Sequence, residues 1–234
     1  MPFLRGRLPI PIPEPVGRGR PGCGYTRPWS VLRWLGGVPL SGLRLDEVAL
    51  ADDLAAFLRA LRAVDAARGP AAGPQSFHRG ADLAAYDDDV SRSLDKLSGE
   101  VDARAVRAVW SRARRSHWVL PPAWLHGDVA PSNLLIFDRR LAAVIDFGQT
   151  AVGDPACDLV MAWTYFGDVA RHRFLDRNEL DADTLDRARG WALWKALLAA
   201  AGAAHNGTDP DTVSRRWGWS RAPTEVLDLL RLDQ

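Results

Sequence analysis

Cysteine and lysine are both scarce in this chain of 234 residues, which contains two of each. Cys23 and Cys157 cannot build the disulfide framework of a small secreted domain, so we expect a reducing, cytoplasmic environment. Prolines interrupt residues 2–15, where a secretory signal peptide requires an apolar core, and no secretion signal is evident. Cys157 is expected to be a small buried apolar residue.

Long hydrophobic runs and an excess of one charge are also missing. The most apolar segment, residues 191–204, contains Lys195 and is too short to span a bilayer. The formal net charge is +1, and the arginines are interleaved with Asp and Glu, whereas binding to a phosphate backbone requires a concentrated basic patch. We therefore expect neither a membrane nor a nucleic-acid partner. The length suffices for one large domain, or a domain with a small companion.

A predicted strand and hairpin occupy residues 123–145. The apolar residues 123–125 are typical of a short buried strand, which would deliver His126-Gly127-Asp128 onto a loop. Residues 134–137 and 141–145 are apolar and flank a polar turn, a pattern that predicts a β-hairpin.

Asn133 precedes this hairpin and Asp146 follows it, so both side chains are expected at the same end of the ribbon. An amide and a carboxylate oxygen there suit Mg²⁺, which takes oxygen ligands and keeps waters and substrate phosphates. Asp128 would then accept the proton of an incoming hydroxyl. Any one of these residues alone is more often a turn former. The ordered set, at this spacing, predicts phosphoryl transfer.

His126 and Asp128 also form an H-x-D pair, which can bind a divalent ion in a metal-dependent hydrolase. That alternative requires further His or Asp ligands and leaves Asn133 without a role. The remaining histidines lie in unrelated segments and show no metal-ligand spacing.

These motifs resemble those of the aminoglycoside phosphotransferase and choline kinase-like family. They are His126-Gly127-Asp128 with Asn133, Ile145-Asp146-Phe147, and Gly153-Asp154-Pro155 with Asp158-Leu159. The resemblance implies an α+β, protein-kinase-like fold, with a truncated small N-terminal β lobe and a large, mainly helical C-terminal lobe that carries a catalytic β-hairpin. It also implies ATP, Mg²⁺ and transfer of the γ-phosphoryl group to a hydroxyl of a small-molecule acceptor.

The resemblance further implies a role for each matching residue. Asp128 would be the catalytic base, and Asn133 and Asp146 would hold Mg²⁺. The residues expected to support the catalytic loop are His126, Asp158 and, as the cap of a helix beginning near Pro155, Asp154. Upstream, residues 8–15 and 29–37 resemble the last strands of the small lobe and its hinge. The hinge backbone that would meet the adenine comprises Arg33, Trp34 and Leu35.

This comparison divides the chain into residues 1–37, a remnant of the N-terminal lobe with the hinge, and residues 38–234, the helical lobe. The family places a phosphate-covering loop and a strand-borne lysine ahead of the hinge, whereas Lys96 and Lys195 both follow it. Arginine is a poor substitute for such a compact charge. Two alternatives therefore stay open: an active small-molecule kinase, and a catalytically impaired or inactive relative that binds a ligand or partner.

Residues 17–22 match the phosphate-binding pattern G-x-G-x-x-G by letter. Prolines alternate in the preceding segment, and Pro21 and Pro28 exclude a helix directly afterwards, so we interpret residues 17–22 as a hairpin tip or loop. The proline-rich residues 8–28 are the part of the chain most similar to a linker.

The rest of the sequence is predicted to be largely helical. Apolar residues recur at helical spacing in residues 45–64, 83–97, 101–110, 155–166, 183–203 and 223–232. The segment around Trp191 and Trp194 is apolar on most sides and predicts a buried helix. Trp217 and Trp219 are expected in a loop after an Asn206-Gly207 turn.

Overall fold

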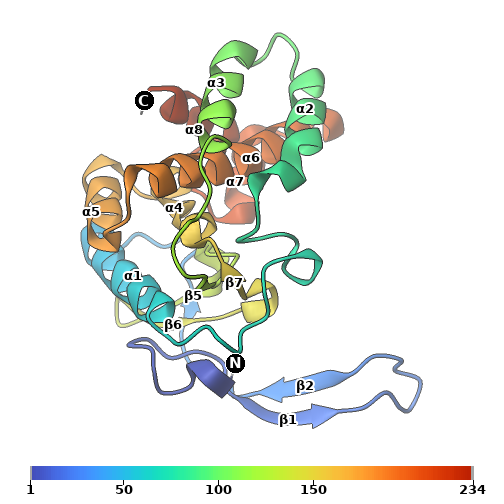
Figure 1. Ribbon diagram of the computed structural model, residues 1–234, viewed down its shortest axis with the longest axis vertical. Coiled ribbons are helices and arrows are strands. Elements are labelled where there is room, and N and C mark those ends of the chain that lie inside the picture. The colour runs from blue at the N-terminus through green and yellow to red at the C-terminus, as the bar shows by residue number, and fades with distance from the viewer. Residues whose placement is uncertain (1, 233–234) are drawn as a thin grey trace.

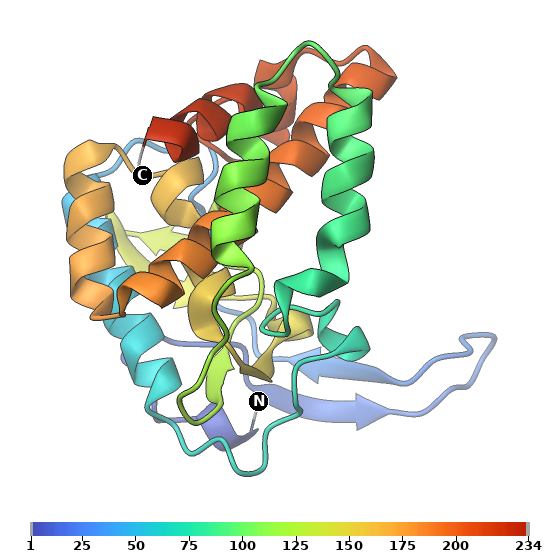
Figure 2. The same cartoon turned by 45° about the horizontal axis from the view of Figure 1, so that its top comes forward.

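The computed structural model describes residues 2–232 and shows a helical body, a few central strands and one hairpin that extends to the side (Figures 1 and 2). The α-helices are α1 (Glu47–Arg62), α2 (Asp87–Lys96), α3 (Ala103–Ala113), α4 (Met161–Thr164), α5 (Asp168–Asn178), α6 (Ala182–Asn206), α7 (Pro210–Trp217) and α8 (Pro223–Leu232). The strands are β1 (Pro15–Gly19), β2 (Trp29–Leu32), β3 (Val38–Pro39), β4 (Ala123–Leu125), β5 (Leu134–Phe137), β6 (Arg140–Val144) and β7 (Ala151–Gly153). Short 3₁₀ helices form at Pro2–Leu4, Pro74–Ser76, Leu83–Tyr86, Pro131–Asn133, Phe147–Gln149 and Pro155–Leu159.

The extended hairpin consists of β1 and β2, which pair antiparallel with Gly19 opposite Trp29. A bridge between Gly22 and Tyr25 lies near its tip. A Cβ on Gly19 would come within 1.9 Å of the Trp29 ring, so a side chain there would displace that ring. Within residues 2–232, neither strand pairs with the other sheets. The two views show the hairpin projecting away from the helices (Figures 1 and 2).

The structure corrects two expectations for this region. The strand predicted over residues 8–15 begins only at Pro15, because the alternating prolines before it lack the N–H donors that a ladder requires. The linker interpretation of residues 8–28 is also wrong in part, since these residues include β1. Gly17 and Gly19 lie in the strand, and no helix follows the glycine pattern within the hairpin.

The central strands form the predicted hairpin and two further pairings. In the hairpin of β5 and β6, Leu134 lies opposite Val144, and β3 adds to the outer side of β5. The turn residues Asp138 and Arg139 have φ values of 47° and 59°, the left-handed conformation that tight hairpin turns require. Strand β4 is buried as predicted and pairs with β7, which the sequence analysis did not anticipate.

Helix α6 is the central helix of the body and packs against α2, α3 and α8. The Asp181 carboxylate caps its start by accepting a hydrogen bond from Thr184 N at 2.7 Å. Gly190 allows α3 to approach closely, because a Cβ there would lie 2.6 Å from the Ala113 Cβ. Although α6 has 25 residues, neither it nor any other helix within residues 2–232 is long and apolar enough to cross a membrane.

The helical periodicity predicts α1, α2, α3, α6 and α8 to within a few residues. The predicted helix over residues 155–166 is instead a 3₁₀ helix followed by the short α4. Helix α5 was not predicted, and α7 forms where a loop was expected. Asp209 caps α7 by accepting from Thr212 N, and Gly218 ends it with a φ of 70°.

Candidate functional site

The loop between β4 and β5 begins with a turn that a buried carboxylate holds in place. Asp158 accepts hydrogen bonds from His126 N at 2.7 Å and from Gly127 N at 2.8 Å. Gly127 has a φ of +86°, and a Cβ there would lie 2.5 Å from the Gln149 carbonyl oxygen, so glycine is required. Burial raises the pKa of Asp158 despite the opposing effect of both backbone hydrogen bonds.

The His126 ring is fully buried, and both of its nitrogens are engaged. Nε2 lies 2.9 Å from Ile145 O, and Nδ1 lies 3.2 Å from Asp128 N. A carbonyl oxygen can only accept and a backbone N–H can only donate, so we assign the ring proton to Nε2. His126 then has no nitrogen left for a metal, which removes the H-x-D metal pair on which the hydrolase alternative rests.

Asp128 makes an ion pair that sequence spacing does not reveal. Its Oδ1 accepts a hydrogen bond from Lys195 Nζ of α6 at 2.9 Å. Burial raises the pKa of Asp128, but the charge and hydrogen bond of Lys195, together with smaller contributions that include the charge of Arg79, bring the pKa below its ordinary value. The carboxylate is therefore ionised at neutral pH. An ionised carboxylate can accept a hydrogen bond from a hydroxyl.

A second cation, Arg79, lies near this pair. Its guanidinium stacks over the Trp194 ring at 4.3 Å, and Nη1 donates to Tyr86 Oη at 2.8 Å. Arg79 is 9% exposed, and its Nε has no hydrogen-bond partner within residues 2–232. The positive charge of Arg79 contributes to the lowered pKa of Asp128. The region around the base therefore carries two cations, Lys195 paired with Asp128 and Arg79 stacked against aromatic rings.

Asn133 and Asp146 meet at one end of the β5–β6 hairpin, because Ile145 N donates to Asn133 O at 2.9 Å. The Asn133 side-chain amide donates to the Asp128 carbonyl at 2.9 Å. This bond uses the amide nitrogen and leaves the amide oxygen for another ligand. Asp146 is exposed and has a φ of 62°, and its Oδ1 accepts from Gly148 N at 3.3 Å.

These two residues fit a hard cation such as Mg²⁺. They offer one amide and one carboxylate oxygen, and Mg²⁺ takes the remainder of its shell from water and phosphate. Within residues 2–232, no group of three or more His, Cys, Asp or Glu side chains is arranged to hold a metal. The donor set is thus that of an open oxygen site.

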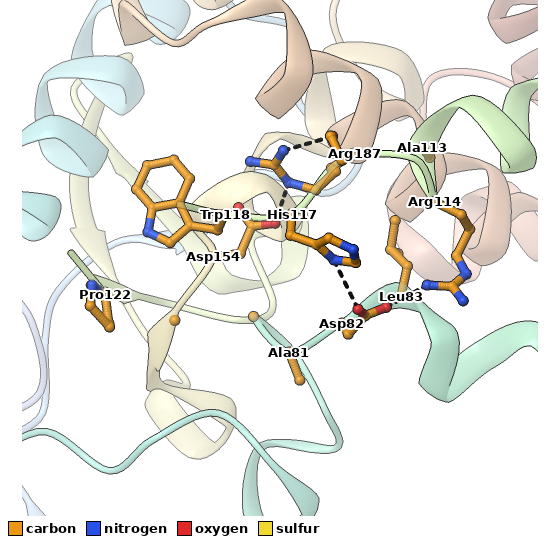
Figure 3. A pocket seen from close by; sticks show the side chains of 13 residues that line it. Ala81, Asp82, Leu83, Ala113, Arg114, His117, Trp118, Pro122, Asp154 and Arg187 are labelled. Atoms are coloured by element: carbon orange, nitrogen blue, oxygen red, sulfur yellow. Dashed lines mark hydrogen bonds and ion pairs between the residues drawn. The ribbon is translucent and has the colours of Figure 1, made fainter. Parts of the chain in front are cut away.

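Asp154 lies at the other end of the β4–β7 pair and lines a separate cavity (Figure 3). Its carboxylate forms a buried ion pair with Arg187 Nε at 2.7 Å and accepts from Ala156 N at 3.1 Å. Burial raises the pKa of Asp154, although Arg187 opposes the shift. The cavity measures about 310 Å³ and is lined by Gly80, Ala81, Asp82, Leu83, Ala113, Arg114, Ser116, His117, Trp118, Pro122, Gly153, Asp154 and Arg187. Asp154 therefore connects α6 to the start of the 3₁₀ helix, away from Asp128.

Arg33, Trp34 and Leu35 connect β2 to β3. Arg33 N donates to Glu14 O at 2.8 Å, and Trp34 is 90% exposed. In the described part of the chain, no hydrogen bond joins these three residues to the catalytic loop. Their nearest structural link to the site is β3, which pairs with β5 through Val38 and Ile136.

The sequence and the structure were both compared with those of known proteins. A family model described as "Phosphotransferase enzyme family" matches residues 1–197. No curated protein sequence matches the chain. The GDP complex of wild-type aminoglycoside 2'-phosphotransferase-IIIa matches with a TM-score of 0.62 and 19% identity, covering 99% of this chain and 79% of that one.

Two further solved structures extend the comparison. The ternary complex of streptomycin, ATP and APH(2")-IIa has a TM-score of 0.57 and 18% identity, covering 92% of this chain and 75% of that one. Macrolide 2'-phosphotransferase MphH from Brachybacterium faecium has a TM-score of 0.55 and 20% identity, with coverages of 94% and 77%. These matches confirm the resemblance and the predicted fold class of a kinase-like α+β protein with a large helical lobe.

Proposed function

The chain belongs to the phosphotransferase enzyme family, and from this premise we propose that it transfers the γ-phosphoryl group of ATP to a hydroxyl of a small molecule. One observation carries the proposal. Asp128 is a half-buried, ionised carboxylate that lies on a fixed loop beside the paired ligand candidates Asn133 and Asp146. The inactive alternative is not favoured, because the base and both oxygen donors are present in one arrangement.

In the proposed reaction, Asp128 accepts a hydrogen bond from the acceptor hydroxyl and takes its proton as the oxygen attacks phosphorus. General base catalysis of this kind contributes a factor of about 10² to 10⁴ in rate. Asp158 and His126 accept hydrogen bonds from the backbone N–H groups of His126 and Asp128, so the carboxylate is positioned before the acceptor binds.

Asn133 and Asp146 would hold Mg²⁺, which neutralises charge on the phosphates when it is bound. The left-handed backbone of Asp146 and its bond to Gly148 N fix the carboxylate at the end of the hairpin. Because Asn133 also bonds to Asp128 O, the metal ligands and the base share one rigid segment.

Residues 1–37 are proposed to act as the small lobe and hinge, and residues 38–234 as the helical lobe. The backbone of Arg33, Trp34 and Leu35 would then meet the nucleotide base. The matching structures hold GDP in one case and ATP in another, and their names include aminoglycoside and macrolide phosphotransferases. We therefore propose a nucleoside triphosphate as donor and a hydroxyl-bearing small molecule as acceptor.

The test is release of ADP from Mg²⁺-ATP in the presence of an aminoglycoside, a macrolide and a neutral sugar, each alone. We expect one class to stimulate the wild type and Asp128→Asn to lower that stimulated rate by about 10² to 10⁴. Asp88→Asn, at an exposed position in α2, is the matched control and should behave as the wild type. A stimulated rate that survives in Asp128→Asn would remove the proposed base.

A further inference from the structure

Lys195 is a charged residue in an otherwise apolar part of α6. Its neighbours Trp194 and Ala196 are buried, and its own side chain is 14% exposed. An ammonium group has three hydrogen-bond donors. Within residues 2–232, the Lys195 ammonium makes one hydrogen bond, to Asp128 Oδ1. A lysine in such a place is normally paired, and this one is paired with the proposed base.

The geometry of the proposed reaction brings the transferred phosphoryl group close to this ammonium. A hydroxyl bonded to Asp128 lies about 3 Å from the carboxylate, and the attacked phosphorus lies about 3.5 Å beyond that oxygen. Phosphorus therefore lies roughly 6.5 Å or less from the carboxylate. Lys195 Nζ is 2.9 Å from the same carboxylate, so a phosphoryl group on the Lys195 side of Asp128 lies near this ammonium.

We propose that Lys195 is a catalytic residue that bridges Asp128 and an oxygen of the transferred phosphoryl group. This inference rests on the proposed function. In the step, the bond between phosphorus and the ADP oxygen breaks, and the bond to the acceptor oxygen forms. The hydroxyl proton passes to Asp128. Lys195 donates one hydrogen bond to the Asp128 carboxyl group and another to an oxygen of the phosphoryl group.

The surroundings favour this role over simple neutralisation of Asp128. Arg79 already supplies a second positive charge near Asp128, and its stacking on Trp194 with a bond to Tyr86 fixes that charge in place. Neutralising Asp128 therefore does not use all three donors of the Lys195 ammonium, and a phosphoryl oxygen, which carries negative charge, is a suitable second acceptor.

The other lysine of the chain provides a matched control. Lys96 is exposed at the C-terminal end of α2, whereas Lys195 is largely covered on α6. The substitutions Lys195→Met, Lys195→Gln and Lys96→Met remove the same charge from two different places. Lys195→Gln keeps a hydrogen-bond donor for Asp128. This variant can therefore be measured if Lys195→Met does not fold.

The experiment is calorimetry of Mg²⁺-ATP and Mg²⁺-ADP binding, without acceptor, to these variants and the wild type. Loss of a charge-assisted hydrogen bond corresponds to about 10- to 100-fold in affinity. We expect Lys195→Met and Lys195→Gln to weaken ATP binding by this factor and to leave ADP binding unchanged. Lys96→Met should match the wild type for both nucleotides. Unchanged ADP binding also reports that each variant is folded.

Each other outcome overturns the inference. If both Lys195 variants keep the wild-type ratio of ATP to ADP affinity, Lys195 only neutralises Asp128 and does not contact the phosphoryl group. A weakening that is equal for both nucleotides in Lys195→Gln indicates a structural role and has the same consequence. If the wild type binds neither nucleotide, the proposed function itself is overturned, and this inference with it.

Discussion

The molecule contains two antiparallel hairpins of similar size that differ in their surroundings. In the catalytic hairpin of β5 and β6, Leu134 and Val144 are fully buried, and β3 adds a third strand. In the N-terminal hairpin of β1 and β2, Trp29 and Val31 are each about half exposed, and no further strand is added within residues 2–232. A two-stranded ribbon alone is marginally stable in water, so packing is what distinguishes the two.

This difference in packing corresponds to two different proposed roles, metal binding beside the buried hairpin and nucleotide contact beside the exposed one. Phosphoryl transfer requires a base and two oxygen donors at fixed positions, and Asn133 and Asp146, at one end of the buried hairpin, are the proposed donors. The exposed hairpin leads into residues 33–35, which are proposed to contact the nucleotide through backbone groups. Substitutions in the buried hairpin of β5 and β6 should therefore change both stability and activity. Substitutions in the exposed hairpin of β1 and β2 should change stability little.

The largest expected effect is at the buried ion pair between Asp154 and Arg187. Asp154→Asn leaves the buried Arg187 guanidinium without its charge partner, which typically costs about 3 to 5 kcal/mol. Urea denaturation measures this change in the free energy of unfolding. Asp53→Asn is the matched control, because the Asp53–Arg140 pair is largely exposed at Arg140 and surface ion pairs contribute little to stability. Equal losses in the two variants would contradict the larger effect of the buried ion pair.

A smaller loss is expected at Asp158, which accepts two backbone hydrogen bonds. Asp158→Asn replaces one acceptor oxygen with a donor, so the N–H of His126 or Gly127 loses its partner. We expect a loss of about 1 to 3 kcal/mol in the free energy of unfolding and a lower turnover number. Unchanged turnover in a folded variant would show that the loop keeps its shape without this carboxylate.

The pH dependence of the same variant follows from the raised pKa of Asp158. The folded state holds this proton more tightly than the unfolded state, whose pKa is near the ordinary value of 3.8. Stability from Asp158 is therefore fully present below 3.8 and decreases as pH rises through the raised pKa. The stability advantage of the wild type over Asp158→Asn should shrink over that interval in urea denaturation at successive pH values. If the stability advantage of the wild type over Asp158→Asn grows with pH, the raised pKa of Asp158 is contradicted.

The smallest effect is expected in the exposed hairpin. Val31→Thr changes a half-exposed side chain and should alter the free energy of unfolding by no more than about 0.5 kcal/mol. Val144→Thr makes the same change in the buried hairpin, where an unpaired hydroxyl costs about 1 to 3 kcal/mol. Thermal or urea unfolding of both variants compares the hairpins directly. Similar losses in the two would remove the distinction between them.

Much of the catalytic segment could be predicted because its signals are local. The alternation of apolar runs with a polar turn predicts β5 and β6, and the placement of Asn133 and Asp146 follows from the pairing. Helix α7 also had a local signal, Asp209-Pro210 at its start and Gly218 at its end, which the loop prediction overlooked. The β5–β6 hairpin and helix α7 depend on residues that are neighbours in the chain, so one amino-acid sequence is sufficient to predict them.

The remaining features depend on contacts that sequence spacing does not contain. Helix α5 lacks an apolar stripe, since its buried residues include Arg171 and Asn178 as well as Phe174, and packing on α1 determines it. The Lys195–Asp128 pair joins two segments that are far apart in the chain. A lone lysine in a buried helix was visible in the sequence, but its partner was not.

The most direct test of the account is calorimetry of Mg²⁺-ATP binding to the wild type, Asp146→Asn and Asp138→Asn. Asp138 is exposed in the turn at the far end of the same hairpin, and asparagine tolerates the left-handed backbone at both positions. We predict that the wild type and Asp138→Asn bind alike, while Asp146→Asn binds at least about tenfold more weakly. Absence of binding by the wild type, or equal binding by all three, would contradict a phosphoryl-transfer site at this end of the hairpin.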